Sequence, residues 1–328
     1  YEMITSDWSS DVCSSDLWVG ANSVGWKPYI CGVKRIISIV GTTGIGKTKL
    51  AIGLARALGA EIISCDSRQF FREMPIGTAA PTAAELGLAR HHFVGHLSVE
   101  DSYSIGQFEI DALKKVDELF QTYDNIVLVG GSMMYEKALI RGLNDLPEAN
   151  EENQRKLQKI WKEEGLAQLQ DLLKNLDENY YHRVDLENPR RLLRAIDVIW
   201  QTGEKYSQLI AFPKAKRDFQ TLRIGIEAPR EVIYERINLR VEQMIENGLV
   251  DEVKSLLPYK ESVALKTVGY TEIFKYLSGE WSLDFAISEI KKNSRRFAKR
   301  QLTWYRGEED IHWVGYLNPL EESLSLLQ

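Results

Sequence analysis

A short glycine-rich segment, GTTGIGKTKL at 41–50, has the residue types needed to hold a chain of phosphates. Residues 41–48 match the pattern G-x-x-x-x-G-K-[ST], and an apolar run, RIISIV at 35–40, precedes them. Glycines let backbone N–H groups turn toward phosphate oxygens, and the N-terminus of the next helix adds partial positive charge. We expect a di- or triphosphate here, with Lys47 on its terminal phosphates and the Thr48 hydroxyl on Mg²⁺. The alternative, a chance glycine-rich turn, is disfavoured by the strand–loop–helix context.

A second polar segment, SCDSRQFFREMPIGTAAP at 64–81, follows the next apolar run. Asp66 is expected to project from the carboxyl end of that strand, close to the phosphate loop. A carboxylate at this place could be an indirect partner of Mg²⁺, a general base, or the N-cap of the segment that follows. Position alone leaves the three roles open.

The elements that must position these residues follow the pattern of an α/β protein from Val33 onward. Apolar and β-branched runs predict strands at 35–40, 60–65, 125–131 and 221–228, and helical spacing predicts helices at 47–59 and 111–122. Strands that alternate with helices indicate a parallel sheet of the P-loop NTPase type, with ligands at the carboxyl ends of its strands. Further helices are predicted at 230–247, 249–257, 271–277 and 283–306.

The chain is expected to contain one core and a small insertion. Residues 147–188 are charged and helical in pattern, and we interpret them as an all-helical insertion or lid that contacts a macromolecular substrate. The helix that begins at Asn188-Pro189 is expected to return to the core, which would comprise 33–146 and 189–320. Residues 1–32 are rich in Ser and Asp and are left out of the fold, as either a foreign or a naturally disordered leader.

Composition excludes several classes of protein. The 328 residues carry 41 basic and 47 acidic side chains, a net charge of −6, which argues against a general polycation but permits local basic patches. Three cysteines without metal-ligand spacing make a disulfide scaffold or zinc site unlikely and favour the cytoplasm. His91, His92 and His96 lack a Cys or carboxylate at ligand spacing, so we expect loop or core roles. Apolar runs are too short for a membrane span. We expect a monomer.

Several segments together resemble one known family. They occur in this order: GTTGIGKTKLA, EIISCDSRQFFREMPIGTAAP, VGGSMMY, NPRRLLRAIDV, PREVIYERINLRVEQMIENGLVDEV, LKTVGYTE and RRFAKRQLTWYRG. The chain thereby resembles the tRNA dimethylallyltransferases, also called tRNA isopentenyltransferases, from about Arg35 to Gly307. The P-loop alone is shared by many activities, whereas DSRQ downstream of it and KRQLTW near the end are far more selective.

The resemblance implies a reaction. Dimethylallyl diphosphate would give its prenyl group to N6 of adenosine 37 beside the tRNA anticodon, and its diphosphate would leave. Asp66 would be the general base, Lys47 with Mg²⁺ would stabilise the departing diphosphate, and the Ser132 hydroxyl would donate to the diphosphate or the base. A positioned carboxylate suits this role, because an exocyclic adenine amine is a poor nucleophile and must lose a proton. The diphosphate would bind the whole loop and one arginine: Gly41, Thr42, Thr43, Gly44, Ile45, Gly46, Lys47, Thr48 and Arg240.

The same resemblance implies contacts with tRNA. These residues match family segments that hold the substrate: Asp66, Ser67, Arg68, Gln69, Thr78, Arg190, Arg191, Arg194, Lys266, Gly269, Tyr270, Arg296, Lys299, Arg300 and Gln301. Two departures occur. Ser132 stands where many relatives have Thr, and Ala80 stands where they have Lys, so any contact made by that lysine would be missing here.

Two charged helical faces can each be interpreted either as a phosphate-binding surface or as an ordinary solvated surface. Arg236 and Arg240 lie four apart and could clamp diphosphate, or they could pair with Glu231, Glu235 and Glu242 on an exposed face. Residues 291–300 carry six cations, the aromatic residues Phe297, Trp304 and Tyr305 lie among or just after them, and no acidic residue occurs between Lys291 and Arg306. Such a stripe suits phosphate backbone contacts, although charge runs are more often solvated surfaces.

Rival functions remain at this point. The same core could serve an ATP-dependent small-molecule kinase, with Asp66 as the base for a hydroxyl acceptor. It could also serve prenyl transfer to free adenine nucleotides, as in the adenylate isopentenyltransferases. A third alternative is a non-enzymatic RNA-binding adaptor, which would not need Asp66.

Overall fold

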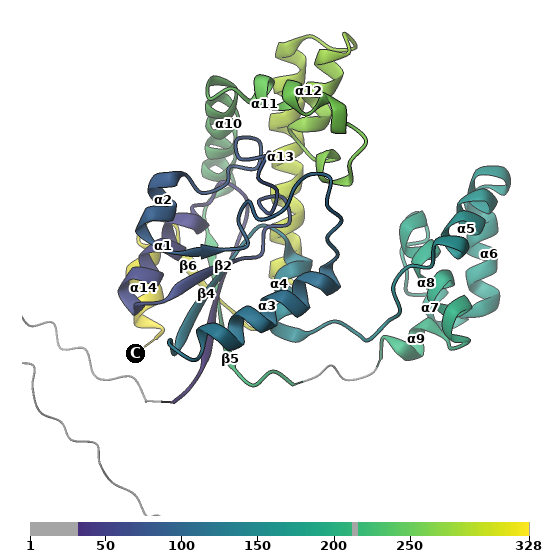
Figure 1. Cartoon of the computed structure of the whole chain (residues 1–328), viewed down its shortest axis with the longest axis horizontal. Coiled ribbons are helices and arrows are strands. Elements are labelled where there is room, and N and C mark those ends of the chain that lie inside the picture. Colours follow the sequence, from purple (N-terminus) through teal and green to yellow (C-terminus); the bar gives the residue numbers. More distant parts are fainter. Residues whose placement is uncertain (1–31, 212–215, 328) are drawn as a thin grey trace, which may run out of the picture. The chain divides into compact units, whose positions relative to one another are not determined.

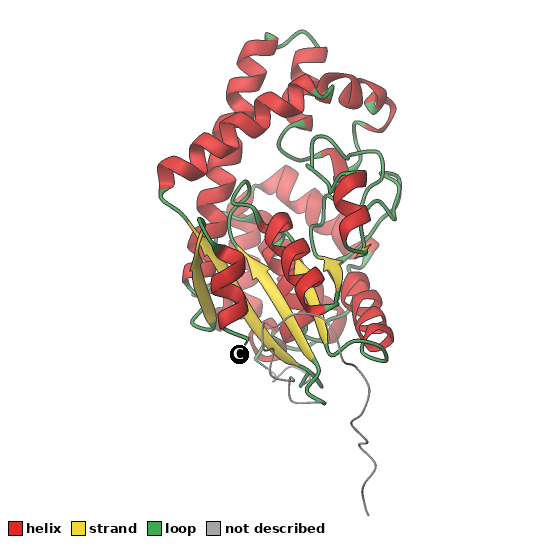
Figure 2. Cartoon of the chain, turned by 90° about the vertical axis from the view of Figure 1, so that its left-hand side faces the viewer, coloured by secondary structure: helices red, strands yellow, loops and turns green. Residues whose placement is uncertain are grey.

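The computed structural model describes residues 32–211 and 216–327, and these contain a six-stranded sheet in the order β3-β2-β4-β1-β5-β6. Every strand pairing is parallel. The strands are β1 Arg35–Val40, β2 Glu61–Ser64, β3 His91–His92, β4 Asn125–Val129, β5 Gln220–Glu227 and β6 Ile311–Gly315. Figure 2 shows these strands between helices. The predicted α/β class with a P-loop-type parallel sheet is confirmed.

Both faces of the sheet are buried, because consecutive side chains of β1, β2 and β4 enter different core clusters. Ile36 packs with one cluster and Ile37 with the other, and Ile126 and Val127 repeat this alternation on β4. The first cluster includes side chains of α3, α10, α11, α12 and α13, and the second includes those of α1. The sheet is therefore a rigid base that fixes the loops at its carboxyl edge.

Helices account for most of the remaining described residues (Figure 1). Those outside the insertion are α1 Lys47–Leu58, α2 Ala83–Leu88, α3 Ile105–Leu119, α4 Met133–Arg141, α10 Arg230–Glu246, α11 Leu249–Ser255, α12 Tyr270–Leu277, α13 Leu283–Arg306 and α14 Pro319–Ser325. Short 3₁₀ turns lie at Leu257–Tyr259 and Val263–Leu265. None of the helices in the described residues is long and apolar enough to cross a membrane.

The insertion is larger than predicted. It contains α5 Glu151–Glu164, α6 Leu166–Leu176, α7 Glu178–Tyr181, α8 Pro189–Thr202 and α9 Tyr206–Leu209. Leu192, Ile196 and Ile199 of α8 form a separate core with Leu157 of α5 and Leu173 of α6. The expectation that the helix at 189–202 returns to the main core is therefore wrong, because its apolar stripe is buried by the insertion's own helices.

Other boundaries differ in small ways. The helix predicted at 111–122 begins earlier, because the Ser104 hydroxyl caps it by accepting from the Gln107 N–H. The strands β3 and β6 had no counterpart among the predicted elements. The predicted leader at 1–32, with Cys13 and Cys31, lies almost wholly outside the described residues.

Candidate active site

The phosphate loop joins the end of β1 to the start of α1. Gly41 and Gly46 have φ of 140° and 107°, in the region that favours glycine. A Cβ at Gly41 would lie 3.2 Å from the carbonyl oxygen of Ile226 on the neighbouring strand. The first N–H groups of α1 have no partner within the helix, and Lys47 and Thr48 line the pocket beside the loop, so these groups are available as donors for an anion.

Part of the predicted diphosphate set forms the wall of a pocket of about 750 Å³, which we call the phosphate-loop pocket. Thr43, Gly44, Gly46, Lys47 and Thr48 line it. Gly41, Thr42 and Ile45 lie behind this wall and are buried. The Ile45 side chain packs into the sheet core. These three residues therefore support the loop from behind, which differs from the direct contacts expected from the motif.

The Lys47 ammonium turns back over the loop. It donates to the carbonyl oxygens of Gly41 and Thr42, at 3.1 and 2.8 Å. Burial lowers the pKa of Lys47 to about 8, against the attraction of Asp66 and with added repulsion from Arg240. A lysine with this pKa gains its full charge when an anion arrives, so it is suited to a phosphate ligand.

Asp66 follows the end of β2 and is held by two backbone donors. Its Oδ1 accepts from the Arg68 N–H at 3.1 Å, and its Oδ2 accepts from the Gly131 N–H at 3.0 Å. A Cβ on Gly131 would lie only 2.8 Å from Oδ2, so the close approach of the loop after β4 requires glycine there. The carboxylate is thus fixed in direction while one side of it faces the pocket.

Gln301 of α13 ties the phosphate loop to the loop that holds Asp66. Its Oε1 accepts from the Thr43 N–H at 2.8 Å, and its Nε2 donates to the Gly131 carbonyl oxygen at 2.8 Å. The side chain is fully buried. Because both amide atoms are used within the chain, Gln301 is a positioning residue, which differs from the tRNA contact that the sequence suggested.

The residues next to Asp66 are also held by polar contacts. The Ser132 hydroxyl accepts from the Ser67 N–H at 3.0 Å and lies 2.8 Å from the Ser67 hydroxyl. The Arg68 guanidinium donates to the carbonyl oxygens of Val263 and Ala264. The Gln69 amide donates to the carbonyl oxygens of Thr78 and Ala79. The polar segment 66–69 is therefore an ordered wall.

The loop at 75–80 faces this wall and is held from behind by Glu252 of α11. The Glu252 carboxylate accepts from the N–H groups of Ile76 and Gly77 at 2.8 and 2.9 Å. It also accepts from the Tyr270 hydroxyl at 2.5 Å. Tyr270 is fully buried, and burial raises its pKa. The tRNA contact predicted for this side chain is wrong, because its ring packs inside the molecule and supports the loop.

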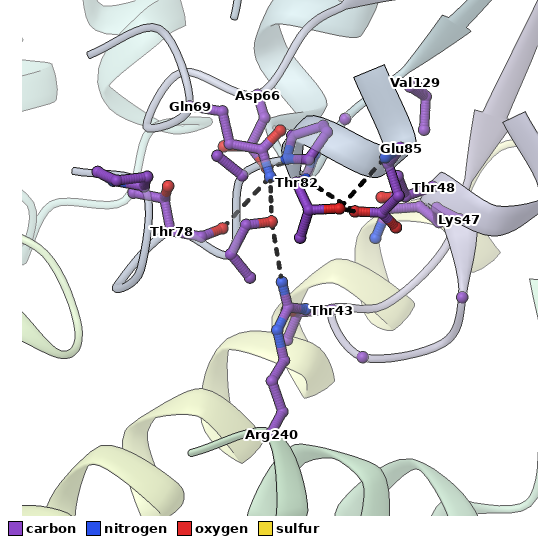
Figure 3. A pocket seen from close by; sticks show the side chains of 18 of the residues that line it. Thr43, Lys47, Thr48, Asp66, Gln69, Thr78, Thr82, Glu85, Val129 and Arg240 are labelled. Carbon is purple, nitrogen blue, oxygen red and sulfur yellow. Dashed lines mark hydrogen bonds between the residues drawn. The ribbon is translucent and has the colours of Figure 1, made fainter. Parts of the chain in front are cut away.

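A second pocket of about 660 Å³ meets the phosphate-loop pocket beside Asp66. Several of the predicted tRNA residues line it: Asp66, Ser67, Arg68, Thr78, Lys266, Gly269 and Arg300. Thr43, Asp66, Thr78 and Arg240 line both pockets. Figure 3 shows Asp66 and Thr78 across from Arg240, with the phosphate loop alongside. Asp66 can therefore be reached from two directions.

Two arginines of α10, Arg236 and Arg240, reach the site. Arg236 donates to the Ile45 carbonyl oxygen at 3.0 Å, and Arg240 donates to the Thr43 hydroxyl at 3.3 Å and to the Ala79 carbonyl oxygen at 3.5 Å. Both line the phosphate-loop pocket. Of the two interpretations for this helix, the structure thus favours the diphosphate clamp. Arg240 lies next to the segment where Ala80 replaces the lysine of relatives.

The six cations of the basic stripe of α13 divide into two groups, three with partners inside the chain and three exposed. Lys291 and Lys292 pair with Glu242 and Glu289, respectively, and Arg295 donates to the Asn238 side-chain oxygen. Arg296, Lys299 and Arg300 are exposed, and Arg300 reaches the edge of the second pocket. The end of the helix nearer Gln301 therefore presents the cations that a polyanion could contact.

The remaining predicted tRNA residues lie on α8. Arg190 and Arg191 are exposed near its first turn. Arg194 is half-buried, where it donates to the Pro147 carbonyl oxygen and pairs with the fully buried Asp197. Arg194 is thus the member of the triplet that fixes the insertion's own fold, as its position one turn further into the helix allows.

No metal-ligand cluster of His, Cys, Asp or Glu occurs within residues 32–211 and 216–327. His91 bonds to the Ala89 carbonyl oxygen, and His92 pairs with Glu61. His96 packs edge-on against the rings of Phe70 and Tyr103, and His91 also lines the phosphate-loop pocket. Sequence reasoning assigned no role to Glu252 or Met244, and it noted Phe297 only as a ring among the cations. Met244 and Phe297 line both pockets. The signal for Met244 was spacing, since it lies one turn from Arg240.

Comparison with known proteins places this geometry in context. A family model described as IPP transferase matches residues 69–308. The chain belongs to the IPP transferase family. Within the family, it is 50% identical to the tRNA dimethylallyltransferase of Christiangramia forsetii over 281 residues, covering 86% of this chain and 93% of that protein.

Solved structures agree with this assignment to the IPP transferase family. The full-length tRNA isopentenylpyrophosphate transferase of Bacillus halodurans is 33% identical, with a TM-score of 0.63, and the match covers 89% of this chain and 99% of that one. A eukaryotic dimethylallyltransferase acting on tRNA has a TM-score of 0.79 at 24% identity, covering 90% of this chain and 78% of that one. That second likeness shows the shared fold.

Proposed function

We propose that this chain transfers the dimethylallyl group from dimethylallyl diphosphate to N6 of adenosine 37 in tRNA and releases diphosphate. The observation that carries the proposal is the position of Asp66, which lines both pockets. One pocket is built on a phosphate loop, and the other has Lys266 and Arg300 at its edge. The names of the similar proteins, which specify tRNA, favour the same reaction.

The chemistry needs one base and one anion site on opposite sides of the reacting carbon. The N6 lone pair forms a bond to C1 of the donor, the C1–O bond breaks, and its electron pair leaves with diphosphate. The N6 proton passes to the Asp66 carboxylate, whose direction is fixed by the N–H groups of Arg68 and Gly131. This arrangement provides general base catalysis with a fixed geometry.

The departing diphosphate is stabilised by fixed positive groups. Lys47, Arg240 and the N-terminus of α1 surround the phosphate-loop pocket. The donor set also fits Mg²⁺, because Thr48 offers a hydroxyl oxygen in this pocket and Mg²⁺ commonly takes one or two protein oxygens with substrate phosphates. When bound there, the ion would neutralise charge on the diphosphate oxygens.

The adenine would enter through the second pocket. A stacked base cannot place N6 against Asp66, so adenosine 37 must leave the stack of its loop. Asp66, Ser67, Arg68 and Ser132 line the path, and the exposed cations of α13 lie where they can contact the flanking phosphates. A free adenine nucleotide would not require this exposed cationic face, which is why we favour tRNA as the acceptor.

The experiment is a transfer assay with labelled dimethylallyl diphosphate and one of three acceptors: unmodified tRNA, AMP or ATP. We expect label in tRNA, and digestion should locate it on N6 of adenosine 37. Label in AMP or ATP with none in tRNA would instead support an adenylate isopentenyltransferase. Label in no acceptor, with hydrolysis or transfer of an ATP phosphate, would support the kinase.

A further inference from the structure

The junction between the two pockets is lined by both polar and apolar side chains. Its polar side chains are those already described, namely Thr43, Asp66, Thr78 and Arg240. Two apolar side chains, Met244 and Phe297, also line both pockets. The remaining apolar lining belongs to one pocket or the other, as with Leu239 in the phosphate-loop pocket and Val268 in the second pocket.

The positions of Met244 and Phe297 follow from helical geometry. Met244 lies four residues after Arg240 on α10, and Phe297 lies four residues before Gln301 on α13, so each shares a helix face with a site residue. Met244 is half-buried and packs against the main core. The Phe297 ring is half-buried, with the Arg300 guanidinium 5.7 Å from its centre. Contacts outside the junction therefore hold both side chains in place.

A prenyl diphosphate must satisfy two constraints at this junction. Its diphosphate belongs on the phosphate loop, and its C1 must lie within reach of an amine beside Asp66. The apolar end of the donor then has to lie against the junction wall, where contact with polar groups would leave those groups without hydrogen bonds. Met244 and Phe297 are the apolar side chains that span this place.

We propose that Met244 and Phe297 form the binding surface for the prenyl tail and set its maximum length. This inference rests on the proposed prenyl transfer. A dimethylallyl group fits between the two side chains with C1 at Asp66. A geranyl group, longer by one isoprene unit, meets them before its C1 can reach that position. Met244 and Phe297 therefore determine which length of prenyl group is accepted, and they do so at the junction, away from the diphosphate.

The test compares geranyl with dimethylallyl diphosphate as donors to the same tRNA. We expect Met244→Ala and Phe297→Ala to raise the kcat/KM ratio of geranyl over dimethylallyl by about tenfold or more, because one methylene in an apolar pocket changes discrimination by about that factor. Met244→Leu keeps the volume and should keep the wild-type ratio. Leu239→Ala removes an apolar side chain from the phosphate-loop pocket alone and should leave the ratio unchanged.

The outcomes separate this inference from the function on which it rests. If wild-type protein uses dimethylallyl diphosphate but neither alanine variant changes the ratio, the length limit is overturned and prenyl transfer stands. An equal change in Leu239→Ala also overturns it, since the junction would then have no special role. If wild-type protein transfers no prenyl group at all, both proposals fall. Equilibrium binding of the two donors without tRNA gives a second readout, in which geranyl diphosphate should gain affinity in the alanine variants only.

Discussion

The Asp66 carboxylate is oriented by two backbone N–H groups and stays open toward the junction of two pockets. A carboxylate with only a structural role would have no reason to remain accessible there. The charges of Lys47 and Arg240, which line the phosphate-loop pocket, interact with that of Asp66. At the scale of single residues, base and anion site are thus neighbours with opposite charge and separate tasks.

Replacing Asp66 by Asn should separate these tasks. The rate of prenyl transfer should fall by about 10²- to 10⁴-fold, because the variant has no carboxylate to take the N6 proton. Diphosphate affinity should hold or increase, since a negative charge near the phosphate loop is removed. Single-turnover kinetics and calorimetry with pyrophosphate measure the two quantities. Asp284→Asn, at the start of α13, provides the charge-matched control. Full transfer activity in Asp66→Asn would exclude Asp66 as the base.

Lys47 should make the affinity for diphosphate depend on pH. Its pKa is lowered to about 8, so the free protein loses this charge as the pH rises through 8. A bound diphosphate favours the ammonium form and raises the pKa again, so binding near pH 8.5 should take up a proton and should weaken as the pH rises further. Calorimetry in buffers of different ionisation enthalpy measures this uptake. Lys47→Arg, which stays charged in this range, should abolish the part due to the lysine. Equal uptake in the variant would contradict the assignment.

At the scale of elements, α13 connects the acceptor side with the phosphate side. Its Arg300 lines the second pocket, and Gln301 next to it binds both the phosphate loop and the loop after β4. The helix therefore fixes the position of the phosphate loop, which follows β1, relative to the loop that follows β4. A change on this helix can affect the reaction without touching either substrate.

Gln301→Leu should weaken the donor site and spare tRNA affinity. It leaves the Thr43 N–H and the Gly131 carbonyl oxygen without partners, which costs about 1–3 kcal/mol for a buried group. We expect kcat/KM for the donor to fall by about tenfold to a hundredfold, with pyrophosphate binding weaker and the tRNA Kd unchanged. Thr303→Ala, an exposed change on the same helix, should have no effect. A weakened tRNA Kd with normal pyrophosphate binding would instead restore the direct tRNA role.

The exposed cations of α13 should carry salt-dependent tRNA binding. Changing Arg296, Lys299 and Arg300 together to Gln should weaken tRNA binding. The slope of log K against log salt should become shallower by about 0.7–0.9 for each tRNA phosphate that these side chains neutralise in the wild-type protein. Filter binding across a salt series measures both. Lys291→Gln with Lys292→Gln is the control, since those lysines already pair with Glu242 and Glu289. An equal effect in the control would mean that overall charge, and not this face, governs binding.

At the scale of the whole molecule, sequence pattern predicts the elements that carry strong local signals. The bounds of α13 match the prediction at both ends, and α1 ends at Leu58 with Gly59 as its C-cap, where glycine permits the left-handed conformation. The two-residue β3 is too short to leave a pattern. The stripe of α8 predicted a helix correctly but not its partner, because an apolar face does not say which surface will cover it.

The candidate site likewise has parts that the sequence predicts and parts that it does not. Motif spacing predicted the phosphate loop, since the backbone geometry of such loops follows from glycine positions. The place of Asp66 followed from the predicted strand before it, and its role came from the family resemblance. It could not predict that Tyr270 and Gln301 direct their polar atoms inward, because that depends on which backbone groups the fold leaves unpaired nearby. The role of Glu252 could not be predicted for the same reason, because its three hydrogen-bond donors come from segments distant in sequence.

The most direct measurement is a crystal structure of the chain with an unreactive thio analogue of dimethylallyl diphosphate and an anticodon stem-loop. We expect the diphosphate on the N–H groups at the start of α1, with adenine N6 entering from the second pocket to within hydrogen-bonding distance of Asp66. Diphosphate bound elsewhere, or an adenine lodged in the phosphate loop with Asp66 turned away from N6, would contradict the proposed reaction.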